Sequence, residues 1–110
     1  SFDDIVLEAI NESLISIFGE EPARSVNFYI DPNIALTDAE AYVKALRRMF
    51  MEGANVIVVG ICDRISQLTG LGKSGVSSLG EFIREVRGRY VNQDGDSRHS
   101  TDDGTLISAR

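Results

Sequence analysis

Residues 37–68 read TDAEAYVKALRRMFMEGANVIVVGICDRISQL and contain two apolar-faced stretches that meet at Gly53. The first stretch begins with a capping box, in which Thr37 caps free amides and Glu40 reaches back to the cap. Its apolar side chains then recur at three- and four-residue spacing, which predicts an amphipathic helix. Gly53 is expected to break or sharply bend the chain after this helix. The expected buried face comprises Tyr42, Val43, Leu46, Met49 and Phe50.

Residues 55–68 are the most hydrophobic run of the chain and are expected to lie at the centre of the core. The segment VIVVGI alone has the composition of a buried strand. However, Ile57, Ile61, Ile65 and Leu68 step at four, four and three residues, so one helix accounts for the whole run. We favour the helix and keep the strand as the alternative. Gly60 would then let a neighbouring helix pack closely.

The segments before this stretch predict two further helices. An amphipathic helix is expected over residues 2–18, capped by Ser1 and ended by Gly19. A short helix is expected to start at Glu20-Glu21-Pro22 and to be ended by Asp31-Pro32-Asn33, although SVNFYI is rich in β-forming residues and a strand is the alternative. The apolar stripe of this short helix comprises Ala23, Val26, Tyr29 and Ile30.

The segments after it predict a loop, a last helix and a polar tail. Three glycines in TGLGKSG, residues 69–75, indicate a loop. Ser77 and Ser78 are expected to cap a helix that ends near Tyr90. Residues 91–110 are rich in Asp, Ser and Gly and are typical of a disordered tail. The buried face of the last helix is expected to comprise Leu79, Phe82, Ile83, Val86 and Tyr90.

These segments together predict an all-α fold, a small bundle of about five helices over residues 1–90, with a disordered or extended C-terminal tail over residues 91–110. The composition, with 43% hydrophobic and 25% charged residues, is that of an ordinary globular domain. A net charge of −6 disfavours broad binding to nucleic acid or anionic membrane. The sequence contains neither a membrane-spanning run nor a signal peptide, so we expect a cytoplasmic protein.

No motif specifies a cofactor, a metal or a catalytic group, and none is expected. Gly72, Lys73 and Ser74 match the end of a phosphate-binding loop and are candidates for anion binding, but the required glycine five residues earlier is Gln67. The segment DGDS at residues 94–97 lacks the glutamate of a calcium loop. Cys62 is expected to be a buried structural thiol, and His99 has no partner in the sequence.

Two small basic clusters stand out in this acidic chain. The first lies on the helix predicted after Thr37, at Lys44, Arg47 and Arg48, and the second lies on the last helix. We interpret both clusters as solvated faces balanced by nearby glutamates. A helix-turn-helix that uses the basic last helix is the alternative, although its seven-residue connection would be long. The second cluster comprises Arg84, Arg87 and Arg89.

Three segments occur in an order that resembles one known family. They are FDDIVLEAI at residues 2–10, the aromatic-containing ARSVNFYI at residues 23–30, and ALRRMFMEGA at residues 45–54, which leads into an apolar helix. Over residues 2–71 this order is similar to the Nitrosopumilus-type output domain, a small archaeal domain of signal-transduction proteins. The resemblance implies an all-helical signalling or interaction module without catalytic residues, and it carries over no functional residue. Residues 72–110 lie outside it.

We therefore predict a non-enzymatic signalling output or protein-interaction module that binds a protein partner and forms a homodimer. Five apolar stripes in so short a chain exceed what one small bundle buries. Met49, Phe50 and Met51 are the expected contact residues, and Leu106 and Ile107 are a second candidate contact in the tail. The alternatives are a nucleic-acid-binding regulator using the last helix and a nucleotide- or phosphate-binding α/β fragment.

Overall fold

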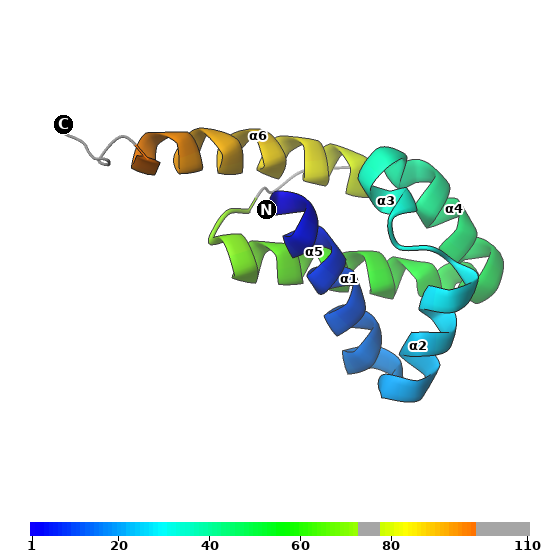
Figure 1. The fold of residues 1–110 in the computed structure, drawn as a ribbon. Coiled ribbons are helices and arrows are strands. Elements are labelled where there is room, and N and C mark those ends of the chain that lie inside the picture. Colours follow the sequence, from blue (N-terminus) through cyan, green and yellow to red (C-terminus); the bar gives the residue numbers. More distant parts are fainter. Residues whose placement is uncertain (73–77, 99–110) are drawn as a thin grey trace.

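The computed structural model describes residues 1–72 and 78–98, with the side chains of residues 92–98 excepted. Within these residues every regular element is a helix, so the predicted all-α class is confirmed (Figure 1). Five helices have ten or more residues, and a single-turn helix, α3, was not predicted. In chain order the elements are α1 (Phe2–Phe18), α2 (Glu20–Tyr29), α3 (Ile34–Thr37), α4 (Ala39–Phe50), the 3₁₀ turn η1 (Met51–Gly53), α5 (Ala54–Thr69) and α6 (Leu79–Arg98).

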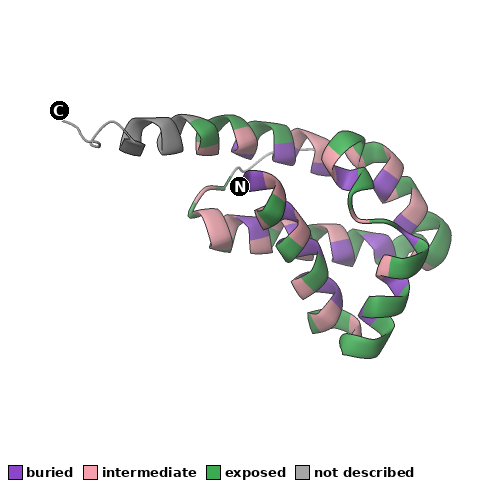
Figure 2. Ribbon diagram, viewed as in Figure 1, coloured by how far each residue is buried: buried purple, intermediate pink, exposed green. Residues whose placement is uncertain are grey.

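The core forms around the crossing of α1 and α5, which make the most extensive interhelical contact. Residues 55–68 are helical, as predicted, and Ile57, Ile61 and Ile65 are fully buried at the expected spacing. α2 packs on α1, α4 packs on α5, and α6 contacts α1, α4 and α5. In Figure 1, α6 lies across one side of the other helices and projects beyond them at its C-terminal end. Buried residues recur along the helices and alternate with exposed ones (Figure 2).

The predicted start of α1 is confirmed. Ser1 Oγ accepts a hydrogen bond from the Asp4 backbone N–H at 3.3 Å, and the Asp4 carboxylate reaches back to the Ser1 amino group at 3.5 Å. Gly19 ends the helix at φ 93°, a backbone conformation that favours glycine. At the other end of the chain, Ser78 Oγ accepts from the Glu81 backbone N–H and caps α6, whereas Ser77 lies outside the described residues.

The predicted N-cap of α4 is wrong by one residue. Thr37 is the last residue of α3, and its hydroxyl donates to the Ile34 carbonyl. The Asp38 carboxylate instead accepts from the Ala41 backbone N–H at 3.1 Å and caps α4. Both residues are good N-caps. Asp38 is the cap because Thr37 already belongs to the helical turn α3, where its hydroxyl is bound to the Ile34 carbonyl.

The break after α4 also lies at a different residue from the one predicted. Gly53 has ordinary helical angles, φ −62° and ψ −18°, so it neither breaks nor sharply bends the chain. The turn occurs at Met51, at φ 56° and ψ −129°, and among the residues that the structure describes it is the one non-glycine residue with positive φ. These angles are close to the first central position of a type II′ turn, which glycine usually occupies. The chain therefore reverses direction at a strained methionine.

α6 continues past Tyr90 to Arg98, whereas the hydrophobic pattern predicted its end near Tyr90. Its buried face is as predicted, with Leu79, Phe82, Ile83 and Val86 buried and Tyr90 half-buried. The Tyr90 ring lies 5.6 Å from the Phe2 ring and closes the core at the start of α1. Residues 99–110, with the candidate contacts Leu106 and Ile107, lie outside the described residues.

Gly60 of α5 faces Ser13 of α1, so substitutions at this position probe how closely the two helices pack. A methyl group at this position would meet Ser13 Oγ at 3.7 Å and Cβ at 3.8 Å, which is ordinary van der Waals contact. We expect Gly60→Ala to raise the free energy of unfolding by about 0.5–1 kcal/mol, because glycine disfavours a helix interior. Gly60→Leu should raise it less than Gly60→Ala, because the larger side chain must fit beside Ser13 in the surface depression that Gly60 lines.

Urea unfolding followed by circular dichroism measures both changes. Gly88→Ala is the matched control, since a methyl group there meets nothing within 4 Å and should stabilise α6 by a similar amount. A Gly60→Ala protein that is less stable than wild type would show that the two helices need glycine at their contact.

The backbone at Met51 and Gly53 gives a second prediction. Met51→Gly should stabilise the protein by about 1 kcal/mol, because relief of the positive-φ strain exceeds the added entropy of the unfolded chain. Gly53→Ala should also stabilise it by about 0.5–1 kcal/mol, since its Cβ would lie 3.7 Å from Phe50 Cβ. If thermal and urea unfolding show both variants to be destabilised, glycine is required at residue 53 and the turn is not at residue 51.

Candidate functional site

Large apolar side chains are exposed where α2 and α4 end. Phe28 is 82% exposed, Tyr29 73%, Met51 71% and Met49 42%, and Phe50 between them is half-buried. Single exposed apolar residues are common on protein surfaces, but a contiguous group of large ones is typical of an interaction site. We call these five residues the Met–aromatic surface.

The short helix α2 explains why two aromatic residues are exposed. Ala23, Val26 and Ile30 face the core at three- and four-residue spacing, and this face is all that α2 buries. Phe28 lies on the opposite side of the helix, whereas Tyr29 lies beside the buried face, next to Val26. The two rings pack edge-on at 5.3 Å. The predicted buried stripe of α2 is therefore wrong at Tyr29, and Phe28 was not predicted as a contact residue.

Tyr29, Met49 and Phe50 line one open depression of about 530 Å³, together with Pro22 and Val26. The Phe50 ring stacks on the Phe18 ring of α1 at 5.0 Å and at an interplanar angle of 19°. This contact anchors the end of α4 to the core, so Phe50 provides a rigid base while Tyr29 and Met49 remain accessible. The structure thus brings the predicted residues Met49 and Phe50 together with Tyr29, and Met51 follows directly in the chain.

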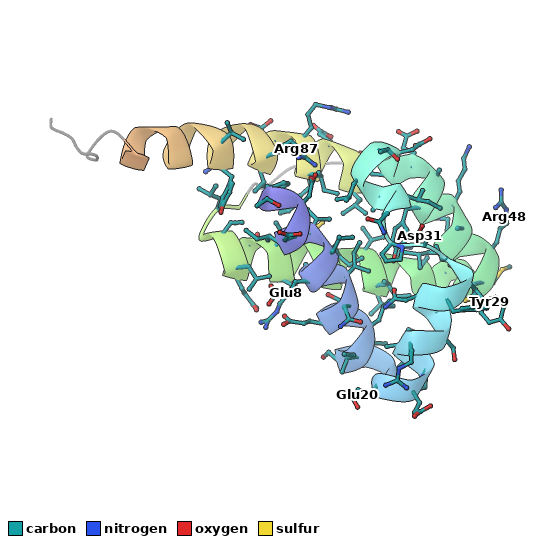
Figure 3. All side chains as sticks on the ribbon, viewed as in Figure 1. Glu8, Glu20, Tyr29, Asp31, Arg48 and Arg87 are labelled. Atoms are coloured by element: carbon teal, nitrogen blue, oxygen red, sulfur yellow. The ribbon has the colours of Figure 1, made fainter. Side chains whose placement is uncertain are left out.

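The edge of this surface carries both charges. Figure 3 shows Tyr29 and Arg48 directed outward on the same side of the molecule. On α2, Arg24 and Glu21 form an exposed ion pair at 3.3 Å. On α4, Lys44, Arg47 and Arg48 form no ion pair within the described part of the chain. An apolar centre with a charged edge is the usual organisation of a protein–protein interface.

The basic cluster of α6 is largely occupied by contacts within the domain. The Arg87 guanidinium lies 4.9 Å from the centre of the Phe2 ring and 2.8 Å from the Asp3 carboxylate. Arg89 donates to the Gly72 carbonyl at 2.6 Å. Arg87 and Arg89 are therefore occupied by contacts within the domain, and among the described residues only Arg84 of the three has no such contact. This arrangement disfavours nucleic-acid binding by the cluster.

The phosphate-loop interpretation lacks its structural context. It requires a strand before the glycine-rich segment, and the structure has helix α5 there. Gly72 is exposed and its carbonyl is bound by Arg89, whereas Lys73 and Ser74 lie outside the described residues. Over the described residues, no three His, Cys, Asp or Glu side chains gather as metal ligands would.

The groups with raised pKa belong to the core. Burial raises the pKa of the fully buried Tyr42 hydroxyl, which has no hydrogen-bond partner among the described residues. Burial and, to a smaller extent, the charge of Asp63 raise the pKa of the half-buried Cys62 thiol to about 11. Both shifts favour the neutral form, so neither group is activated as a nucleophile.

Comparisons with protein-family models, curated proteins and solved structures found no match to this chain. The resemblance to the archaeal output domain therefore stays a prediction. None of the helices that the structure describes has the length and apolar character that crossing a bilayer requires.

The raised thiol pKa predicts slow alkylation of Cys62. Near pH 8 the native protein should react with iodoacetamide roughly a hundredfold more slowly than free cysteine, and the rate should rise about tenfold per pH unit towards pH 11. Because the shift favours the neutral thiol, its contribution to stability is present below the ordinary thiol pKa and is lost as the pH rises towards 11.

Mass spectrometry over time measures the alkylation rate. Protein unfolded in urea is the control and should react at the rate of free cysteine. Rapid alkylation of the native protein near pH 8 would contradict the burial of this thiol.

Proposed function

We propose that this chain is a non-enzymatic protein-interaction module and that its Met–aromatic surface binds an apolar surface of a protein partner. The observation that carries the proposal is the depression in which the exposed Tyr29 and Met49 flank the half-buried Phe50. The exposed Phe28 packs on Tyr29, and the exposed Met51 follows Phe50 in the chain. The resemblance to an output domain adds that the partner belongs to a signal-transduction system.

The size and chemistry of the surface support a protein partner. An aromatic side chain buries about 150–250 Å² when it is covered, so Phe28 and Tyr29 together present roughly 300 Å² of accessible surface. With Met49 and Met51 added, the surface reaches the upper part of the range of about 300–600 Å² for the largest patch of a monomer. Methionine side chains adapt to different apolar shapes, and tyrosine and arginine are enriched at interface hot spots.

The test compares the partner captured by wild type with that captured by Tyr29→Ser/Met49→Ser, using extract from the source cells. These substitutions remove the two accessible walls of the depression and leave the Phe18–Phe50 stack intact. Val91→Ser is the matched control because Val91 is similarly exposed but lies on α6. We expect one stoichiometric partner with wild type and the control and at least about a tenfold loss with the double variant, because hot-spot residues dominate binding.

The captured partner is then purified, and its dissociation constant for the three proteins is measured by titration calorimetry. Circular dichroism of each variant checks that the fold is retained. A partner that binds the double variant as tightly as wild type would place the interface elsewhere, and capture of no stoichiometric partner would count against an interaction module.

A further inference from the structure

A second surface lies on the side of α4 that meets α5 and the start of α6. It is a groove of about 430 Å³, large enough for a short segment of chain. Val43, Val58, Val59 and Leu79 supply its apolar lining, and we call it the α4–α6 groove. Val59 is 59% exposed, although it lies in the middle of the helix that forms the core.

The charges along this groove are mainly positive in a chain of net charge −6. Lys44 and Arg47 line the groove, are exposed and form no ion pair within the described residues. Glu40 is the only carboxylate among its described lining residues. The groove is therefore complementary to a segment that combines apolar side chains with carboxylates.

The chain itself contains such a segment. Residues 99–110 lie outside the described part of the structure, and their sequence, HSTDDGTLISAR, places Asp102 and Asp103 shortly before Leu106 and Ile107. No other adjacent apolar pair follows Val91 before this point. Two carboxylates ahead of two branched aliphatic side chains match the two cations and the valine–leucine lining of the groove.

The length of α6 decides which copy of the chain supplies the segment. The groove lies at Leu79 and Gly80, where α6 begins, and the 20 residues of α6 carry the chain roughly 30 Å away from it. The eight residues from Arg98 to Leu106 span at most about 29 Å when fully extended. This length barely reaches the groove of the same molecule, whereas the groove of a second copy has no such restriction.

We propose that residues 102–107 bind in the α4–α6 groove of a second copy of this chain. Leu106 and Ile107 contact the valine and leucine side chains, and Asp102 and Asp103 pair with Lys44 and Arg47. Reciprocal exchange of the two segments closes a twofold dimer. This proposal does not depend on the Met–aromatic surface.

Sedimentation velocity of the full chain over a wide concentration range tests the exchange. We expect wild type to dimerise, and Leu106→Ser/Ile107→Ser and Lys44→Glu/Arg47→Glu each to raise the dimer dissociation constant at least about tenfold. Combining Lys44→Glu/Arg47→Glu with Asp102→Lys/Asp103→Lys should restore dimerisation, because the two charge signs are exchanged across the same contact. Val91→Ser is the control and should dimerise as wild type does.

Three results would overturn the proposal: wild type that is monomeric at every concentration, unchanged dimerisation of Leu106→Ser/Ile107→Ser, or no recovery in the combined charge exchange. A dimer that is lost in Tyr29→Ser/Met49→Ser but kept in the tail variants would also overturn it and would assign self-association to the Met–aromatic surface. Circular dichroism checks that each variant remains helical. If Lys44→Glu/Arg47→Glu alone fails to fold, its combination with Asp102→Lys/Asp103→Lys still tests whether the two charge clusters pair.

Discussion

α1 and α5 bury aliphatic faces against each other, and every other helix of ten or more residues is positioned by contact with this pair. Ile10 and Leu14 of α1 and Ile57 and Ile61 of α5 are fully excluded from solvent. Such burial contributes about 1.5–3 kcal/mol for each side chain. At the edge of the crossing, Arg64 donates to the Glu12 carboxylate, and this hydrogen bond holds the Glu12 pKa below its usual value.

This crossing limits what the rest of the chain can bury. A chain of this length forms one modest core, and a helix that rests on its surface covers only the face turned inward. The inward face of α2 consists of small and β-branched residues, and its two aromatic side chains remain exposed. α4 buries Tyr42 and Leu46 and stacks Phe50 on Phe18 of α1, whereas Met49 and Met51 at its end remain exposed. The Met–aromatic surface is a consequence of this geometry.

Periodicity was sufficient to predict the helices because an apolar stripe reports directly which side of a helix faces the core. It was sufficient even for the β-branched run that ends at Leu68, since a strand could not account for the polar residues beyond Gly60. Local rules failed where two neighbouring residues were chemically equivalent. Thr37 and Asp38 both cap well, and the unforeseen turn of α3 chose Asp38.

The candidate site was predicted only in part, for a related reason. Met49, Phe50 and Met51 were identified because three adjacent large apolar residues cannot all face inward from one helix. Tyr29 fits the three-residue spacing of α2, and only the tertiary position of that helix shows that the core ends before its ring. The positive φ of Met51 was not predictable from the sequence. Glycine adopts positive φ at a lower conformational energy than methionine, so the turn was expected at Gly53.

α4 is the element that the two proposed contacts share. Arg47 lines the α4–α6 groove and also a depression with Met51, Glu52 and Asn55, so it borders both the groove and one residue of the Met–aromatic surface. A carboxylate bound to Arg47 from one side neutralises the charge available to the other side. An acidic segment in the groove therefore leaves the Met–aromatic surface less attractive to an acidic partner, and more suited to an apolar one. If both proposed contacts form, Arg47 is the side chain through which the charge at one surface acts on the other, without any change in the helices.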